Sequence, residues 1–449
     1  MSSPCYKRIL CVSRFSKFRS TVKHNYKMGD ARCISKSLAP LPLGHVQEKT
    51  VGVPLSELPS TAESLFSPMT IRGLTFNNRI LVSPMCMYSC KDQDGVFTDF
   101  HLAHIGTLSL RGPALVFIEA TSVLPNGRLS PQDTGLWSDE QEVALGRLVR
   151  LAKASNGAKI GIQLAHGGRK ASTYPPFHHF EENSGRLGRG IVPNEEGGWG
   201  ADIVAPSAIP WKNDGKYPTP NELTKDQIKE MVAAWASSAE RAVRAGIEVI
   251  EIHAAHGYLI HEFLSGNTNH RSDEYGGSFE NRIRFLLEIV SAIRSVIPEE
   301  MPLFCRLSGT DYVGGGGAPL AKDETGWDIY QVTELCRRFV QLGVDVVDIS
   351  SGGNLSIVTK GIMAPDFGFH LPLTEFIKKA NIPGLTVAAV GSLQNPKLAD
   401  EAVRTGSADL VGIGRHFLKD PNWVYTAAEE LGVNIRWPAQ YSWMWAWRK

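Results

Sequence analysis

Two histidines and a tyrosine follow an apolar, β-branched run of the chain. Residues 247–250 read Ile-Glu-Val-Ile, and His253, His256 and Tyr258 come shortly after them. The run is typical of a buried strand, and Gly257 lets the chain turn past its end. Each imidazole can donate a hydrogen bond to one ligand oxygen, and the phenol of Tyr258 can deliver a proton. The pattern predicts a catalytic group, while a structural His-x-x-His pair or half of a metal site is the alternative.

Short apolar segments alternate with amphipathic ones from Asn78 onward. The predicted strands span residues 79–85, 114–121, 159–165, 247–253, 302–307, 344–350, 385–390 and 409–413. The predicted helices span 99–110, 139–154, 225–245, 280–296, 330–341, 373–380, 397–404 and 421–430. Eight strands alternating with helices predict an α/β fold, a (β/α)8 TIM barrel. A doubly wound sheet is the alternative, but it rarely has eight strands so evenly spaced.

The chain divides into a basic extension over residues 1–50 and one barrel domain over residues 60–449. The first 37 residues hold nine lysines and arginines against one aspartate, a composition that resembles a mitochondrial transit peptide. A disordered extension on a cytoplasmic protein is the other interpretation, and the one we favour. The insertion at 167–223 is rich in glycine, proline and aromatics, which predicts a lid or an added hairpin after the third strand.

The C-terminal tail is unusually aromatic, because Trp443, Trp445 and Trp447 fall within five residues. An apolar tail of this kind is expected to be buried against other protein surface. This predicts a homodimer or higher oligomer unless the tail packs on its own barrel. The formal net charge is +1, so nothing global suggests nucleic acid as a partner. No apolar run approaches the roughly 20 residues that span a membrane. Seven scattered cysteines without a Cys-x-x-Cys pair favour a reducing compartment.

Other strand ends add polar and small residues, which a closed barrel brings to one mouth. They are Ser83, Pro84, Met85, Cys86 and Tyr88 after the first strand, Ala120 in the second, Gln163 in the third, Arg306 in the fifth, Gly391 and Ser392 after the seventh, and Gly414 and Arg415 after the eighth. Glycines after the last two strands are typical of phosphate sites in barrels. An amide and a guanidinium suit the ring of a flavin. A solvated Gln163 and a salt-bridged Arg306 are the alternatives.

Several motifs together carry a resemblance over residues 65–443. They are Ser83-Pro-Met-Cys-Met-Tyr88, Glu119-Ala-Thr121, Gly161-Ile-Gln-Leu-Ala-His-Gly-Gly-Arg-Lys170, the motif around His253, Asn269-His-Arg-Ser-Asp-Glu-Tyr-Gly-Gly277 with Glu280-Asn-Arg282, and Ile413-Gly-Arg415. The chain resembles the old yellow enzyme family of FMN-dependent ene-reductases, in its cysteine-containing, thermophilic-like class. An arginine that this class often carries near the C-terminus is absent, and Trp443 stands near its place.

The resemblance implies a role for each matching position. Tyr88 would line the substrate site. FMN would be contacted by Ser83, Pro84, Met85, Cys86, Ala120, Gln163, Arg306, Gly414 and Arg415. His253 and His256 would bind the carbonyl oxygen of the substrate, and Tyr258 would donate the proton. Cys86 would tune the flavin rather than attack the substrate.

These observations predict an NAD(P)H oxidoreductase that reduces the C=C bond of α,β-unsaturated carbonyl compounds. FMN is the expected cofactor, NADPH or NADH the reductant, and a small molecule the only partner besides further copies of the chain; no metal is expected. One alternative is a flavin isomerase or a specialised biosynthetic reductase. A less favoured one is a metal-dependent barrel hydrolase with His253 and His256 as ligands.

Overall fold

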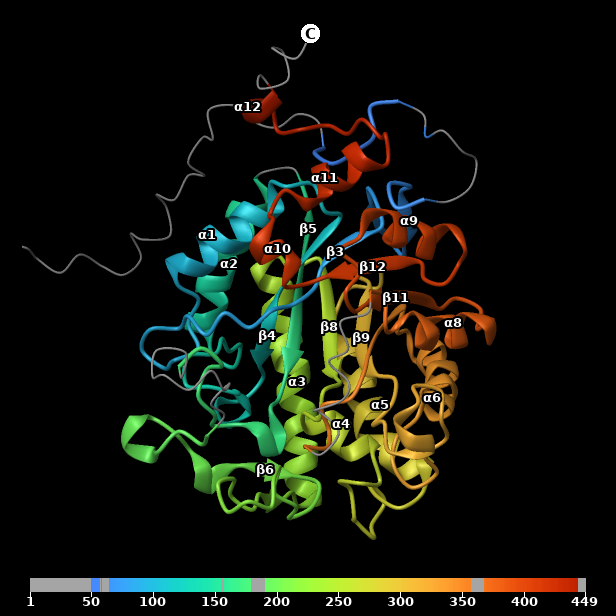
Figure 1. Ribbon diagram of the computed structural model, residues 1–449. Helices are drawn as coiled ribbons and strands as arrows, with labels where there is room; N and C mark the ends of the chain where they lie inside the picture. The colour runs from blue at the N-terminus through green and yellow to red at the C-terminus, as the bar shows by residue number, and fades with distance from the viewer. Residues whose placement is uncertain are drawn as a thin grey trace, which may run out of the picture. The chain divides into compact units, whose positions relative to one another are not determined.

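Eight parallel strands close into a barrel in the computed structural model of the protein (Figure 1). They are β3 Ile80–Val82, β4 Leu115–Ser122, β5 Lys159–Ala165, β8 Val249–Ala254, β9 Leu303–Ser308, β10 Val346–Ser350, β11 Thr386–Val390 and β12 Leu410–Ile413. Around the barrel they follow one another in chain order, and β12 pairs with β3. All eight overlap the predicted strands, so the predicted (β/α)8 barrel is confirmed.

The structure describes residues 50–56, 58, 64–154, 157–178, 190–356 and 367–442. These residues belong to one compact unit that spans Val46–Lys449. Nearly all of the extension predicted over residues 1–50 lies outside the described residues, and so do Trp443, Trp445 and Trp447. The predictions made for the extension, for the aromatic tail and for the domain limits therefore stay predictions.

The long helices surround the strands (Figure 1). They are α1 Asp99–Ser109, α2 Asp139–Lys153, α3 Lys225–Ala245, α5 Phe279–Val296, α6 Ile329–Leu342, α8 Leu371–Lys379, α9 Pro396–Arg404 and α11 Trp423–Glu430. Two of these helices begin with a capping box, in which a Ser or Thr stands three residues before a Gln. The pairs are Ser138 with Gln141 for α2, and Thr224 with Gln227 for α3. Short helices α4 Leu259–Leu264, α10 His416–Lys419 and α12 Ala439–Ser442 complete the set among the described residues.

Apolar side chains fill one end of the barrel interior. Phe117 and Phe304 lie inside, with ring centroids 5.6 Å apart, and Phe76 packs on Phe304 from below. Phe76 comes from the antiparallel pair β1 Met69–Ile71 and β2 Leu74–Phe76. Gly161 gives Phe117 its space, because a Cβ there would lie 2.6 Å from that ring. With this end closed, a ligand can enter only from the end where the parallel strands finish.

The insertion after β5 forms short elements rather than long ones. They are η3 Gly168–Lys170, η4 Asn194–Glu196, η5 Gly200–Asp202, β6 Val204–Ala205 and β7 Asn221–Glu222. β6 and β7 pair in parallel, and residues 179–189 lie outside the described residues. The predicted role of the insertion as a lid stays a prediction. Within the described part of the chain, every helix is too short or too polar to cross a bilayer.

Candidate active site

Four polar side chains form one layer inside the barrel, above the phenylalanines. Gln163, Glu251, Arg306 and Asp348 come from four neighbouring strands, on which alternate residues face the interior. Nε2 of Gln163 donates to Glu251 at 2.8 Å, and Nε of Arg306 lies 3.3 Å from the Asp348 carboxylate. Burial raises the pKa of both carboxyl groups. The sequence predicted Gln163 and Arg306 for this site, but it gave no reason to expect Asp348 beside them.

His253 and His256 lie together at the mouth above this layer. Nδ1 of His256 is 3.3 Å from Nε2 of His253, and Nε2 of His256 is 2.6 Å from Oγ of Ser350. The backbone N–H of Ala255 donates to Nδ1 of His253, so the proton of that ring sits on Nε2. Burial lowers the pKa of both imidazoles far below the usual range, and the charge of Arg306 adds to the effect. Both rings are therefore neutral, and each has one N–H to donate.

Tyr258 and Tyr88 lie on the same side of the barrel as the histidines. The ring of Tyr258 is 4.8 Å from that of His253 and nearly perpendicular to it. Tyr88 packs edge-on against Phe177, which belongs to the insertion. Burial raises the pKa of Tyr88, and it raises the pKa of the Cys86 thiol well above its usual range. Cys86 is therefore a neutral thiol, which is a poor nucleophile.

The loops that follow β8 and β10 cross at two glycines. Gly257 has φ +68°, and a Cβ there would lie 2.3 Å from the carbonyl oxygen of Gly353. Nζ of Lys170 donates to the carbonyl oxygen of His256 at 2.7 Å and to that of Gly353. The turn between His256 and Tyr258 is therefore held by main-chain contacts on one side and by a lysine on the other.

Lys170 and its neighbour Arg169, which we call the basic clamp, come from η3 directly after β5. Nη2 of Arg169 donates to the carbonyl oxygen of Asn354 at 2.6 Å, next to the crossing. The Lys170 ammonium lies 3.9 Å from the centroid of one Trp211 ring and 5.4 Å from that of Tyr258. These cation–π contacts favour the charged lysine and tie it to the insertion. The sequence gave no signal for this role of Lys170 beyond the motif in which it occurs.

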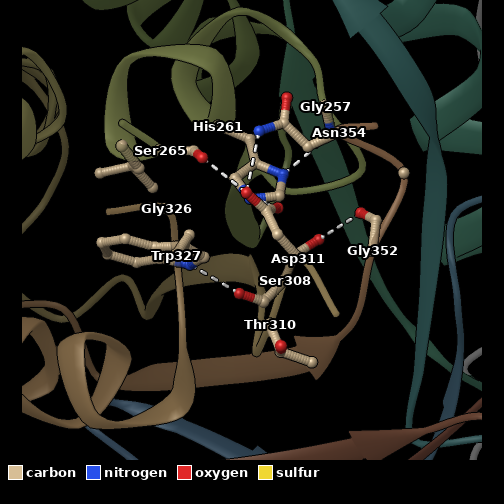
Figure 2. A network of polar contacts seen from close by, with 12 residues as sticks. Gly257, His261, Ser265, Ser308, Thr310, Asp311, Gly326, Trp327, Gly352 and Asn354 are labelled. Carbon is tan, nitrogen blue, oxygen red and sulfur yellow. Dashed lines mark hydrogen bonds and ion pairs between the residues drawn. The ribbon is translucent and has the colours of Figure 1, made fainter. Parts of the chain in front are cut away.

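A buried polar network supports the same turn from behind (Figure 2). The N–H of Gly257 donates to Nδ1 of His261 at 2.9 Å, and Nε2 of His261 lies 3.1 Å from Asp311. The Asp311 carboxylate also accepts hydrogen bonds from Ser265 at 2.5 Å and from Asn354 at 3.1 Å. Burial alone would raise the pKa of Asp311, but His261 and the donors outweigh it and lower that pKa. The charged carboxylate thus orients His261, which in turn fixes Gly257.

A second branch of the network contains Trp327, Ser308 and Gly352 (Figure 2). The backbone N–H of His256 donates to Oγ of Ser308, which itself donates to the Gly352 carbonyl, both at 2.9 Å. Nε1 of Trp327 donates to the carbonyl oxygen of Ser308 at 2.8 Å. The turn is consequently held by hydrogen bonds at two adjacent residues, His256 and Gly257.

The segment after β3 runs beside the end of β12. Oγ of Ser83 is buried without a hydrogen-bond partner among the described residues, and it leaves no space for a side chain at Gly412. A Cβ at Gly414 would lie 3.7 Å from the Met85 side chain. Pro84 and Cys86, on either side of Met85 in the chain, are half-buried. Ala120 lies on β4, the next strand, so the chain brings these residues to one side of the mouth.

The ends of β11 and β12 lie next to each other. Gly391 and Ser392 follow β11 with φ +115° and +53°, and Gly414 and Arg415 follow β12. Arg415 is exposed and makes no ion pair within the described residues. Backbone turns of this kind beside a guanidinium suit a phosphate group. With the partnerless hydroxyl of Ser83 and the charge of Arg306, the residues present fit FMN.

A metal site at the histidine pair would need further ligands close by. Within the described ranges, no group of three or more His, Cys, Asp or Glu side chains is arranged to hold a metal ion. His256 instead contacts Ser350, and His253 is paired with Arg306 on the neighbouring strand.

Comparison with known proteins gives consistent matches. The model of the NADH:flavin oxidoreductase / NADH oxidase family matches residues 64–434. An NADH:flavin oxidoreductase of Gibberella zeae is 43% identical over 386 residues, which cover 86% of this chain and 90% of that protein. The NADPH dehydrogenase of Geobacillus thermodenitrificans is 43% identical over 381 residues, which cover 85% and 98%. A solved structure of morphinone reductase in complex with tetrahydroNAD is 26% identical, with a TM-score of 0.62 and coverage of 83% and 92%.

Proposed function

The chain belongs to the NADH:flavin oxidoreductase / NADH oxidase family, and from this premise we propose that it reduces the C=C bond of α,β-unsaturated carbonyl compounds. It is an oxidoreductase whose cofactor is FMN. The observation that carries the proposal is the group of two neutral histidines and a tyrosine at the barrel mouth, directly above Arg306.

The cofactor and the substrate take different sides of this group in the proposal. Tyr88 lines the substrate site. FMN is held by residues at the barrel mouth: Ser83, Pro84, Met85, Cys86, Ala120, Gln163, Arg306, Gly391, Ser392, Gly414 and Arg415. Bound FMN supplies the hydride that the β-carbon of the substrate receives. Arg306 stabilises negative charge on the ring, and its ion pair with Asp348 keeps the guanidinium in position.

The histidines bind and polarise the substrate. His253 and His256 donate their N–H groups to its carbonyl oxygen, which gains negative charge during the reaction. Because both rings are neutral, they stabilise that charge by hydrogen bonds without first losing a proton. Tyr258 gives its phenolic proton to the α-carbon. The basic clamp and the Asp311 network hold His256 and Gly257, the two residues directly before Tyr258.

We propose NADPH as the reductant, with NADH as the alternative. The relative from Geobacillus thermodenitrificans is named NADPH dehydrogenase, and morphinone reductase was solved with tetrahydroNAD bound. The chain needs no separate nucleotide site, because nicotinamide and substrate can use the same open mouth in turn.

An anaerobic spectrum of the purified holoenzyme tests the proposal. NADPH should bleach the flavin, and 2-cyclohexenone should restore its colour. A flavin that bleaches but recovers only with oxygen would favour the isomerase or a specialised substrate instead. Replacing Tyr258 by phenylalanine should slow the recovery of the flavin colour by roughly 10²–10⁴-fold, which is the usual size of a general-acid contribution. The rate of bleaching by NADPH should stay unchanged. Unchanged recovery would mean that another group donates the proton.

A further inference from the structure

The loop that follows β4 carries a buried carboxyl group with an unused oxygen. Asp133 is 2% exposed. Its Oδ2 accepts hydrogen bonds from the backbone N–H groups of Leu129 at 2.7 Å and Ser130 at 3.0 Å. Its Oδ1 has no hydrogen-bond partner in the described part of the chain. A buried carboxyl oxygen without a partner is costly, so an additional partner is expected for it.

Asp133 and Tyr258 line one small cavity. Its volume is about 10 Å³, roughly the space that one water molecule needs. The rest of its wall consists of Ala120, Ser122, Gly127, Arg128, Leu129, Ala165 and Gly167. Ser122 and Arg128 already donate hydrogen bonds to main-chain carbonyls. Asp133 and Tyr258 both line this cavity, which has room for about one water molecule, so a water molecule in it would contact both residues.

We propose that Asp133 returns a proton to Tyr258 after each turnover, through one water molecule in this cavity. This role rests on the proposed function of Tyr258 as proton donor. The Tyr258 O–H bond breaks as the C–H bond at the α-carbon forms. The phenolate then takes a proton from the water, and the water takes the proton of Asp133. Asp133 recovers one proton from solvent, so no electrons move in the relay and the substrate gains one solvent proton.

The surroundings of Asp133 suit a group that gives and takes a proton near neutrality. Burial and the nearby Glu119 carboxylate raise the pKa of Asp133 to about 7. The two backbone hydrogen bonds and the charge of Arg128 lower this pKa, but they do not cancel the rise. The other titratable groups that feel its charge are Cys86, Cys90 and Tyr88, and burial raises the pKa of all three. They stay protonated at neutral pH, so they do not compete with Tyr258 as acceptors.

The test replaces Asp133 by asparagine, whose carbonyl oxygen can still accept the two backbone hydrogen bonds. In enzyme reduced beforehand by NADPH, the first turnover with 2-cyclohexenone should keep its rate, because Tyr258 already holds its proton. The rate over many turnovers should fall at least about tenfold and lose its dependence on pH near 7. Tyr258→Phe, run in parallel, should slow the first turnover, and adding Asp133→Asn to it should slow the reaction no further.

The outcomes separate the relay from simpler explanations. An unchanged multiple-turnover rate in Asp133→Asn would overturn the proposal. An equal loss in the first turnover would also overturn it, because Asp133 would then only hold the loop in shape. A wild-type enzyme that 2-cyclohexenone does not reoxidise would instead overturn the proposed function. Infrared spectra of the wild-type holoenzyme minus those of Asp133→Asn should contain one carboxyl band that titrates near pH 7. The absence of this band would refute the relay.

Discussion

Replacing Gly257 by alanine tests whether the crossing of the β8 and β10 loops holds the catalytic turn. A Cβ at Gly257 would lie 2.3 Å from the carbonyl oxygen of Gly353 and 2.5 Å from Cα of Asn354. Both are backbone atoms, so no flexible side chain can yield, and the turn itself has to move. Gly277 is a matched control, because it also has positive φ, +80°, but has open space around its Cα.

The difference between the two variants isolates the steric contact. An alanine in the left-handed region costs about 1–2 kcal/mol at either position. Only at Gly257 does overpacking add about 1–3 kcal/mol. The turn carries His256 and Tyr258, and a displacement of about 1 Å at reacting groups can lower a rate roughly 10²-fold. We therefore expect Gly257→Ala to lower both stability and the rate of enone reduction, and Gly277→Ala to lower stability slightly and leave the rate unchanged.

Urea unfolding at one fixed, saturating FMN concentration gives the free energies, and stopped-flow reoxidation by 2-cyclohexenone gives the rate. Gly353→Ala provides an independent check from the other loop, because its Cβ would lie 2.6 Å from the carbonyl oxygen of His256. If Gly257→Ala matched Gly277→Ala in both measurements, the crossing would not constrain the turn, and our account of how Tyr258 is positioned would be wrong.

Two further predictions concern the histidines and the network behind them. His253→Ala should weaken the binding of a phenol while FMN stays bound. Phenol binding is measured by the long-wavelength charge-transfer band that the phenol forms with the flavin. An unchanged band would mean that His253 does not face the ligand. Asp311→Asn should lower the free energy of unfolding by about 3 kcal/mol at pH 7, because it leaves buried donors without their charged acceptor. The folded-state pKa of Asp311 lies below its ordinary value of 3.8, so its stabilisation is present above that pH and is lost as the pH falls further. In urea unfolding the gap between wild type and variant should thus be constant from about pH 7 to pH 5 and shrink below about pH 4, and a gap that widened in acid would contradict the assignment.

The barrel could be predicted from the sequence because its strands are covered on both faces. A strand such as 386–390, Thr-Val-Ala-Ala-Val, is buried throughout, so it appears as a nearly continuous apolar run between amphipathic helices. Helix α4 was missed, since its six residues are all buried and leave no helical periodicity to detect. The hairpin β1–β2 was missed for a similar reason, because each strand has only three residues.

The candidate site could be predicted where its residues lie on strands. Gln163, Arg306 and His253 face the barrel interior, as expected from their positions near strand ends, although their roles stay predictions. Asp133 lies on a loop and Lys170 ends the single turn η3, and neither has a periodicity that relates sequence position to direction. Their proximity to Tyr258 depends on how three separate loops pack, which a single sequence does not reveal.

The basic clamp bonds to backbone oxygens, and every amino acid carries one. Lys170 contacts the carbonyl groups at positions 256 and 353, and Arg169 contacts that at position 354, so none of these hydrogen bonds uses a side-chain atom of the turn. Tyr88 is not among the partners of the clamp, so an exchange at Tyr88 leaves these hydrogen bonds to the turn in place. In evolution, and in directed engineering of this enzyme, side chains around the mouth that make no contact with the clamp can change while the clamp keeps the turn in place.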